Sequence, residues 1–315
     1  MVPSEIDIVY LWVDGSDPQW QAKHDRFAGN PAGDRELDCK GRYVNNDELK
    51  FALRSLELYA PWIRRVFIVT DNQVPAWLET SHPKVRVVDH TEILPPQSFP
   101  CFNSNVIEHC VFRIPELSEH FLLANDDMFI NQAVRPSDFF TSDGHPIIRM
   151  NRRPMRKLTL WLEEHILGKK ISPYNITICR TADIVKKKLG QYIGAKTHHN
   201  IDAYKKSDYG RIYEMFREEI EPTLGNHTRQ ESDIQRNIYS FVPIIEKRCE
   251  LRYVTQKTSF CLQNYKPRHY GKFRKYNPVF FCVNDSEYAT DAHRLMTNQF
   301  LASRFPVPSS FEKRL

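Results

Sequence analysis

Short, continuously apolar runs alternate with amphipathic stretches in the first half of the chain. Runs at 6–13, 66–70, 85–88 and 121–124 are rich in β-branched and aromatic residues, and each ends at a polar turn. Unbroken apolar runs of this length are typical of strands that are buried on both faces, as in a mostly parallel sheet. A further run at 279–283 predicts a fifth strand near the end of the chain.

The segments between these strands carry a helical pattern. Leu49, Leu53 and Leu56 recur at spacings of four and three residues, which predicts a helix with one apolar face. Asn46 or Asp47 can cap its start, and Pro61 lies just beyond its end. A second helix is predicted at about 103–113. The order strand, helix, strand indicates an α/β fold.

After residue 148 the pattern becomes basic and mainly helical. Apolar spacing predicts helices that end near 189 and that span 208–221, 229–241 and 289–304. In the second of these, Ile212, Met215, Phe216 and Ile220 are predicted to face inward. The aromatic, basic and proline-containing segment 264–278 is predicted to be a loop. These features favour a helical insertion in an α/β core.

Composition narrows the class of protein only mildly. The chain has 315 residues, of which 41% are apolar and 26% are charged, as in an ordinary globular enzyme. Its net charge of +5 does not by itself indicate nucleic acid binding. A small basic excess would suit an anionic substrate or an anionic membrane surface, but a merely solvated surface explains it as well.

The sequence contains few features that indicate membrane insertion, secretion or a metal site built from cysteines. No run of apolar residues is long enough to cross a membrane, and the first residues lack the pattern of a signal peptide. Seven cysteines, including Cys39, form no CxxC pair, which disfavours a zinc ribbon and favours free, mostly buried thiols in a reducing cytoplasm. Sequons at Asn175, Asn226 and Asn284 matter only in a secreted chain.

Aspartates follow the predicted strands. One such residue is usually a turn former or a helix cap, but several at corresponding strand ends can share a crevice, which is where open α/β sheets bind ligands. The residues concerned are Asp14, Asp71, Asp89, Asp126 and Asp127. Asn125-Asp126-Asp127 is the sharpest signal, because Mg²⁺ combines one or two carboxylates with substrate phosphates.

Other candidates are weaker from local sequence alone. His199, in the pair His198-His199, could act as a general base, although a surface histidine pair is the plainer interpretation. Glu108 lies on a predicted helix, and Arg54 and Arg229 could contact phosphate or form salt bridges. The chain contains no GxxxxGK[ST], GxGxxG or GxSxG motif, so any bound phosphate must be held by side chains and a metal ion.

Four ordered blocks of sequence resemble the Stealth proteins, a family that includes bacterial capsular polysaccharide phosphotransferases and the catalytic subunit of N-acetylglucosamine-1-phosphotransferase. The first block is Ile6–Trp20, and the second runs from Asn46 through Asn125-Asp126-Asp127 to Phe140. The third runs from His199 to Gln235, and the fourth includes Phe281–Asp285 and Phe305–Glu312. One departure is Asn200–Tyr204, where many bacterial members carry a proline-rich stretch, and this departure concerns the acceptor pocket.

The resemblance implies a fold and a division of the chain. It implies a GT-A-like, Rossmann-type core with a mostly parallel sheet and a helical insertion. Residues 1–148 would form the nucleotide-sugar-binding core, 149–245 the insertion with the third block, and 246–315 a return to the core with the fourth block.

The resemblance also implies roles for individual residues. Members transfer hexose-1-phosphate from a UDP-sugar to a hydroxyl and release UMP. Residues at donor-binding positions are Asp14, Asp17, Arg54, Asn72 and Asn105. Residues at catalytic positions are His199, Glu108, Asp127 and Arg229, with His199 the first candidate base. Residues at positions for Mg²⁺ or Mn²⁺ are Asp126, Asp127, Asn284 and Asp285.

These features lead to one expected function and two alternatives. The expected function is transfer of a hexose-1-phosphate, with N-acetylhexosamine first, from a UDP-sugar to a glycan during capsule or surface polysaccharide synthesis. A glycosyltransferase that releases UDP is one alternative, and a non-catalytic sugar-nucleotide-binding protein is the other. The expected location is the cytoplasm, with peripheral contact at the inner membrane, and no nucleic acid partner is expected.

Overall fold

A five-stranded sheet forms the centre of the protein in the computed structural model, which describes residues 2–27, 41 and 43–314. The strand order is β3-β2-β1-β4-β8, and the first four strands are parallel while β8 is antiparallel to β4. The strands are β1 (Ile6–Leu11), β2 (Val66–Thr70), β3 (Val85–Asp89), β4 (His120–Asn125) and β8 (Asp202–Lys205). The α/β class and the mostly parallel sheet predicted from the apolar runs are therefore confirmed.

Two smaller sheets flank the central one. In the first, β10 (Ser259–Gln263) is parallel to β11 (Phe280–Asn284), which pairs antiparallel with β5 (Met128–Ile130). In the second, β6 (Ile147–Arg152) lies between β7 (Ala195–Thr197) and β9 (Glu250–Tyr253). The fifth strand predicted at 279–283 is therefore present, in the first small sheet. The proposed division of the chain at 149 and 246 stays a prediction.

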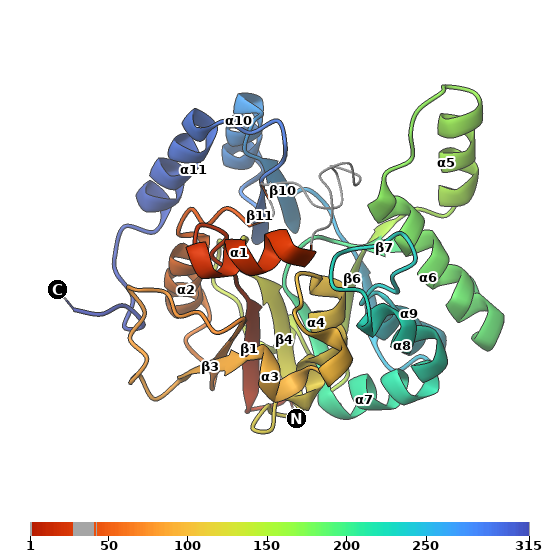
Figure 1. The fold of residues 1–315 in the computed structure, drawn as a ribbon, viewed down its shortest axis with the longest axis horizontal. Coiled ribbons are helices and arrows are strands. Elements are labelled where there is room, and N and C mark those ends of the chain that lie inside the picture. Colours follow the sequence, from red (N-terminus) through yellow and green to blue (C-terminus); the bar gives the residue numbers. More distant parts are fainter. Residues whose placement is uncertain (1, 28–40, 42, 315) are drawn as a thin grey trace.

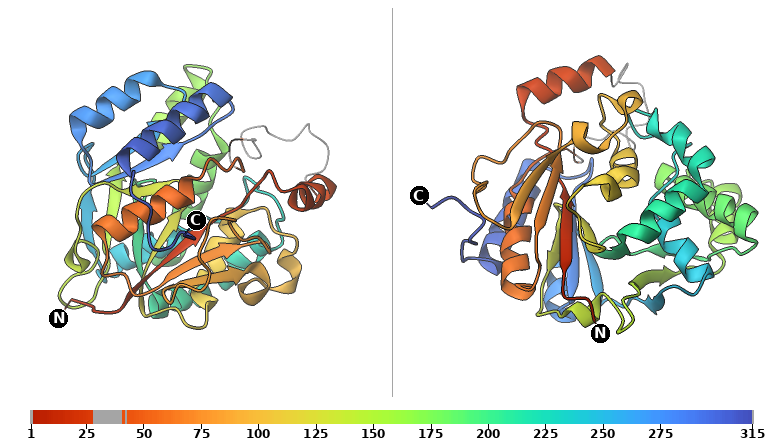
Figure 2. Two further views of the ribbon diagram at one scale, coloured as in Figure 1. Left: turned by 90° about the vertical axis from the view of Figure 1, so that its left-hand side faces the viewer. Right: turned by 90° about the horizontal axis from the view of Figure 1, so that it is seen from below.

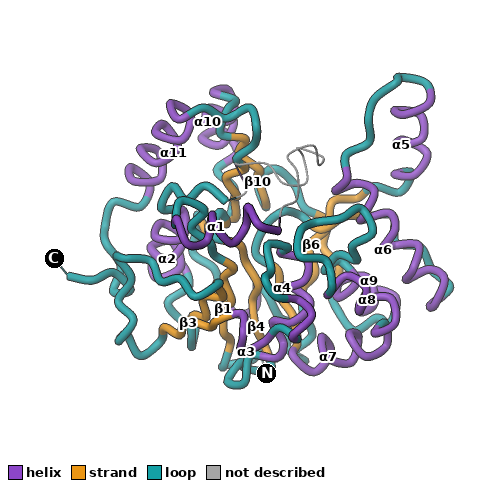
Figure 3. The backbone as a smooth tube through the Cα atoms, in the orientation of Figure 1, coloured by secondary structure: helices purple, strands orange, loops and turns teal. Residues whose placement is uncertain are grey.

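Helices surround these sheets (Figure 1, Figure 3). Those of the first half are α1 (Pro18–Phe27), α2 (Glu48–Tyr59), α3 (His90–Ile93) and α4 (Ser104–Cys110). Those of the middle are α5 (Arg156–His165), α6 (Pro173–Leu189), α7 (Lys206–Met215), α8 (Arg217–Leu224) and α9 (Ile238–Ile245). The last two are α10 (Pro267–Tyr276) and α11 (Asp291–Arg304). Short 3₁₀ turns span Pro96–Ser98, Val111–Arg113 and Pro136–Asp138.

The central sheet separates two apolar cores because successive side chains of a strand point to opposite faces. On β1, Ile6, Ile8 and Tyr10 pack with α2 and the C-terminal elements, whereas Val9 and Leu11 pack with α4 and the helices α6–α9. Figure 2 shows this arrangement from below, with the strands edge-on between the two groups of helices. The end of β4 is less covered, because Asn125, Asp126 and Asp127 are only half-buried.

Several predicted helices differ from those in the structure. The predicted helix 208–221 is two helices that break at Phe216, although Ile212, Phe216 and Ile220 are buried as expected and Met215 is half-buried. The helix predicted at 229–241 starts only at Ile238. The prediction of a loop at 264–278 is wrong, because the helix α10 spans most of this segment. Pro267 occupies the first turn of α10, where a backbone N–H would have no hydrogen-bond partner within the helix.

The predicted cap of α2 is correct in position only. Asp47 stands at the N-cap with a left-handed backbone (φ 63°) and makes no side-chain capping bond. The Asn46 backbone N–H and side-chain amide instead donate to the carboxylate of Glu48, at 2.6 and 2.8 Å. The first turn of α2 therefore holds Glu48 in place, beside the acidic groups described below.

The remaining whole-chain predictions concern cysteines and membrane spans. The six cysteines among the described residues are all free, but only Cys101, Cys110 and Cys282 are buried, and Cys261 is exposed. Cys39 lies outside the described residues. Within the described ranges, no helix is both long and apolar enough to cross a bilayer.

The C-terminal tail is tied to α2 by a buried ion pair. Arg54 donates to both carboxylate oxygens of Glu312, at 2.7 and 2.6 Å, and to the Phe305 carbonyl at 2.9 Å. The side chains of Arg54 and Glu312 are only 12% and 8% exposed. We expect Arg54→Met to lower the free energy of unfolding by about 3–5 kcal/mol, because it leaves Glu312 buried without its cation.

Urea unfolding of the two proteins measures this loss. Arg65→Met is the matched control, since Arg65 pairs with Glu116 at the surface and its removal should cost less than about 1 kcal/mol. Equal losses in the two variants would contradict the role given to the buried pair.

Candidate functional site

A cleft of about 890 Å³ opens at the carboxyl ends of β1, β2 and β4. In Figure 1 these ends are the upper ends of the central strands, and α4 and β11 lie beside them. The strand order reverses between β1 and β4, because β2 and β3 continue on one side and β8 lies on the other. Ligands of open α/β sheets bind at such a switch point. The cleft is also lined by residues 196–199 and 283–288 and by part of the segment 229–237.

Three carboxyl groups gather at the end of β4. Asp126 and Asp127 form the turn between β4 and β5, and Glu48 approaches them from the first turn of α2. Burial raises the pKa of Glu48 to about 7, and the charge of Asp127 adds to this shift. Burial, followed by the charges of Asp127 and Glu48, raises the pKa of Asp126 well above its usual value. Glu48 and Asp126 therefore hold their protons more tightly than solvated carboxyl groups do.

His199 contacts this cluster through Asp127. Its Nε2 lies 3.2 Å from Asp127 Oδ2, and its ring is 38% exposed within the cleft. Burial alone would lower the pKa of His199, but the charge and hydrogen bond of Asp127 outweigh it, so the pKa is raised. The other carboxylate oxygen, Asp127 Oδ1, is buried and has no hydrogen-bond partner among the described residues.

A second buried network lies beneath His199. Arg236 Nη1 is 3.4 Å from Glu108 Oε1, and Arg236 Nη2 is 3.3 Å from Asp202 Oδ2. His198 Nε2 is 3.1 Å from Asp202 Oδ1, which makes this neighbour of His199 a structural residue. Burial raises the pKa of Glu108, although the charge of Arg236 opposes the shift. Glu108 is therefore held by Arg236 rather than left free to take part in proton transfer.

Arg229 and Asn105 line the cleft from the side of α4. Arg229 donates to Ser104 Oγ at 2.6 Å. Asn105 donates to Asp233 Oδ2 at 2.9 Å, and Asn103 donates to the same oxygen at 2.8 Å. These bonds join the start of α4 to the loop at 226–233, so that the third sequence block lies against the second.

Asn284 and Asp285 reach the cleft from the end of β11. The Val283 backbone N–H donates to the Asp127 carbonyl at 2.9 Å, which places Asn284 beside the acidic turn. Asp285 accepts from Arg294 Nε at 2.8 Å and caps the next turn through the Ser286 N–H. Of these two predicted metal ligands, Asp285 is thus already occupied by hydrogen bonds within the protein to a greater extent than the side chain of Asn284.

Four predicted donor-site residues are not among those that line the cleft. Asp14 accepts from the Ser16 N–H, and Asp17 accepts from the Gln19 N–H, so both organise the turn that leads into α1. Asn72 occupies a left-handed turn after β2, and Arg54 binds Glu312 in the C-terminal tail. Their predicted contact with the donor stays a prediction.

Of the aspartates at the ends of the strands, some likewise line the cleft and others stabilise local turns. Asp71, Asp126 and Asp127 line the cleft, and Lys23 forms an ion pair with Asp71. Asp89 instead caps α3 by accepting from the Thr91 N–H at 2.9 Å.

The sequence analysis missed Glu48, Arg236 and Cys261, all of which line the cleft. Arg236 directly follows the third block. Its acidic partners, Glu108 and Asp202, are distant in the sequence, so the residues around Arg236 do not predict its role. Cys261 lies beside Cys282 in the parallel register of β10 and β11. A hydrogen bond with the Cys282 thiol lowers the pKa of Cys261 to about 7, so Cys261 differs from the buried thiols that the sequence predicts.

The residues present fit a divalent cation that also binds phosphate. Among the described residues, no three His, Cys, Asp or Glu side chains are grouped closely enough to hold a metal by themselves. Mg²⁺, however, is usually bound by one or two carboxylates together with substrate phosphates. Asp126, the unpartnered Oδ1 of Asp127 and the amide of Asn284 provide such a partial set of oxygen ligands.

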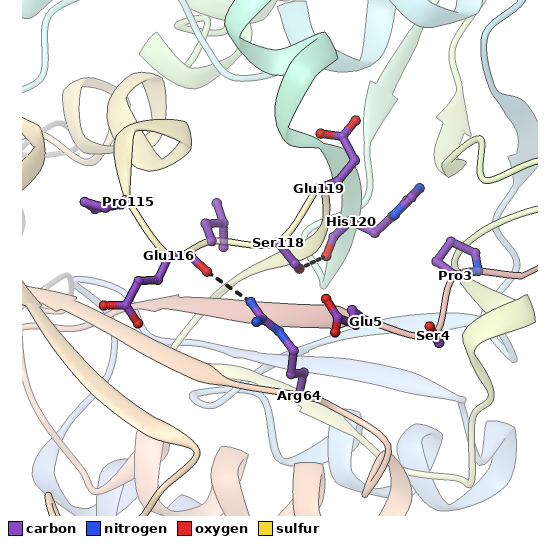
Figure 4. Close-up of a pocket in the computed structure, with 10 residues that line it drawn as sticks. Pro3, Ser4, Glu5, Arg64, Pro115, Glu116, Ser118, Glu119 and His120 are labelled. Carbon is purple, nitrogen blue, oxygen red and sulfur yellow. Dashed lines mark hydrogen bonds between the residues drawn. The ribbon is translucent and has the colours of Figure 1, made fainter.

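A second, shallower cavity lies at the opposite end of the sheet (Figure 4). Several of its polar groups form hydrogen bonds with neighbouring residues. Arg64 donates to both oxygens of Asp7, at 2.8 and 2.6 Å, and to the Glu116 carbonyl at 3.0 Å. Ser118 donates to the His120 carbonyl. This cavity is a structural junction between β1, β2 and β4 and not a candidate site.

Comparisons with known proteins point to one family. Residues 4–31 match Stealth protein conserved region 1, and residues 42–148 match conserved region 2. An exopolysaccharide phosphotransferase of Streptomyces coelicolor is 34% identical over 98% of this chain and 52% of its own length. A capsular polysaccharide phosphotransferase of Haemophilus influenzae is 31% identical over 90% of this chain and 79% of its own length. The chain thus spans about half of the first relative and most of the second.

Solved glycosyltransferase structures align over nearly the whole chain at low identity. The galactosyltransferase LgtC, in complex with donor and acceptor sugar analogues, covers 96% of each chain with a TM-score of 0.47 and 11% identity. Mouse xyloside xylosyltransferase 1 covers 90% of this chain with a TM-score of 0.41 and 11% identity.

The Arg236 network can be tested through its pH dependence. We expect Arg236→Met to lower the free energy of unfolding by about 3–5 kcal/mol near neutral pH, because Glu108 and Asp202 lose a buried cation. Without Arg236 the pKa of Glu108 rises further. The folded variant then binds a proton that the unfolded chain has lost, so its stability falls as pH rises above the ordinary glutamate range.

Urea unfolding at about pH 5 and about pH 7 measures this difference, and the loss caused by Arg236→Met should be larger at the higher pH. Arg252→Met, which removes a surface pair with Glu250, is the control and should cost less than about 1 kcal/mol at both. A loss that is equal at the two pH values would rule out the electrostatic explanation.

Proposed function

The chain belongs to the Stealth protein family, and from this premise we propose that it transfers a sugar phosphate from a nucleotide-sugar to a glycan hydroxyl in capsule or exopolysaccharide synthesis. The finer proposal is transfer of a hexose-1-phosphate, with N-acetylhexosamine first, from a UDP-sugar. The acceptor oxygen attacks the phosphorus bonded to the sugar, UMP leaves, and a phosphodiester forms. The relatives support the reaction class through their names as capsular and exopolysaccharide phosphotransferases.

The observation that carries the proposal is the divided role of the Asp127 carboxylate. Its Oδ2 lies 3.2 Å from His199 Nε2, whereas its Oδ1 is buried without a partner. One aspartate can therefore orient a base and contribute to a cation site at once. A carboxylate that served only as a turn former would have neither feature.

His199 is the base that this geometry favours. When the ring is neutral and Nε2–H donates to Asp127, the lone pair remains on Nδ1, which can take the proton of the acceptor hydroxyl. Glu108, the second candidate, is 9% exposed and paired with Arg236, so it is poorly placed to exchange protons with a substrate. Asp127 thus selects the tautomer of the base as well as its orientation.

The donor phosphates fit the region between the acidic turn and α4. Phosphoryl transfer depends mainly on positioning and on positive charge around the phosphoryl oxygens. Mg²⁺ or Mn²⁺, held by Asp126, Asp127 and Asn284, would offset diphosphate charge and stabilise the leaving phosphate. Arg229, which lines the same cleft, is positioned to contact the transferred phosphate. Asn105 and Asp71 line the cleft beside it, where the nucleotide would lie.

The released nucleotide tests the reaction class. We expect incubation with UDP-N-acetylglucosamine, Mg²⁺ or Mn²⁺ and capsule oligosaccharides to release UMP and to yield a phosphodiester signal in phosphorus NMR. Release of UDP would mean attack at the sugar carbon and would reject phosphate transfer. If no nucleotide appears with any UDP-sugar tried, the protein acts as a binder and the proposal fails.

Substitutions test the assigned residues. We expect His199→Ala to reduce turnover at least about 100-fold, because a positioned base contributes this much to proton transfer. Asp127→Asn should reduce it at least as far, because the base and the cation site both depend on Asp127. His165→Ala and Asp143→Asn are matched controls outside the cleft and should retain full activity. Circular dichroism must show that all four variants are folded, and near-normal rates in either cleft variant would remove that residue from its role.

A further inference from the structure

An apolar helix face protrudes beside the cleft without a partner in the described chain. Figure 1 shows α5 and the segment that follows it standing away from the rest of the molecule, at the upper right. Fourteen large hydrophobic side chains are exposed in the described residues, and the segment 155–167 holds six of them. They are Met155, Leu158, Trp161, Leu162, Ile166 and Leu167, at 42–66% exposure. Apolar surface gathered in this way marks an interaction site.

The exposed apolar residues of α5 share one face. Met155, Leu158, Leu162 and Ile166 follow one another at spacings of three and four residues, and Trp161 flanks them. The charged residues of α5 fall on the other faces, where Arg156 bonds to Asn175 and Lys157 to Asp183. The polar first turn thus fixes the helix to α6, and the apolar face is left toward solvent.

Positive charge lies at both ends of this apolar segment. Arg152 and Arg153 precede it, and Lys169 and Lys170 follow the turn at Gly168. All four side chains are exposed. An apolar helix face with a tryptophan, flanked by lysine and arginine, is the pattern of helices that lie in the interface of an anionic bilayer. Lysine is, by contrast, depleted at protein–protein interfaces.

We propose that α5 and the segment 166–170 dock this protein on an anionic lipid surface, with the apolar face in the bilayer interface and the flanking cations at the headgroups. The segment leads directly into Ser172–Asn175, which line the cleft at the start of α6. Docking would therefore hold the cleft near the membrane, where a lipid-anchored glycan could reach it. The docking itself does not depend on the proposed transfer chemistry, and its test reads binding rather than activity.

Vesicle co-sedimentation of the whole chain tests the proposal. We expect binding to vesicles of phosphatidylcholine with phosphatidylglycerol, weaker binding to phosphatidylcholine alone, and loss of binding to the anionic vesicles at high salt. Leu158→Glu/Leu162→Glu should weaken binding at least about tenfold, because both leucines would leave the bilayer interface. Lys169→Glu/Lys170→Glu should weaken binding to the anionic vesicles by a similar factor.

Matched controls carry the same changes elsewhere. Leu295→Glu alters an exposed leucine on α11, and Lys186→Glu/Lys187→Glu alters two exposed lysines near the end of α6. Both controls should bind vesicles as the unaltered protein does, and all variants should give the same nucleotide release with a soluble acceptor.

Three results would overturn the proposal. The first is an unaltered protein that binds neither kind of vesicle, and the second is equal binding by the α5 variants and the controls. The third is a dimer, detected by sedimentation velocity without any vesicle binding, that Leu158→Glu/Leu162→Glu dissociates. This last result would assign the apolar face to a second copy of the chain.

Discussion

Desolvation of neighbouring carboxyl groups at the end of β4 is the constraint around which the cleft is built. Burial raises the pKa values of Glu48 and Asp126, and the charge of Asp127 adds to both shifts. Charges of one sign in a desolvated space require cations or protons. His199 supplies part of the compensation through Asp127. The unpartnered Asp127 Oδ1 is where a divalent cation with its phosphates would complete it.

The fold brings the compensating groups from separate parts of the chain. The parallel pairing of β1 with β4 places the acidic turn at the switch point of the sheet. The Val283-to-Asp127 hydrogen bond brings the end of β11 to the same turn. Strand β8 begins only a few residues after His199 and pairs antiparallel with β4. This pairing fixes the position of His199 at the cleft. Arg236 then neutralises Glu108 and Asp202 beneath it.

The sequence was sufficient where a structure depends on local pattern. The four parallel strands were predicted because a strand buried on both faces is an unbroken apolar run, and the acidic turn followed from the ends of those strands. Helix α10 was missed because its composition resembles a loop and only the position of Pro267 indicates a start. The strands β5 to β10 depend on pairing with distant partners, which no local pattern encodes. For the same reason, the pairing of Arg54 with Glu312 and the place of Arg236 could not be read from their neighbours in the sequence.

The central claim is that the bond broken lies between the two phosphates of the donor and not at the sugar carbon. It is tested most directly with UDP-N-acetylglucosamine that carries oxygen-18 in the bridge between the sugar carbon and its phosphorus. Mass spectrometry then locates the label after reaction with a soluble acceptor. Our account predicts that the label is retained in the glycan product and is absent from released UMP. Label recovered in UDP, with none in the product, would contradict it.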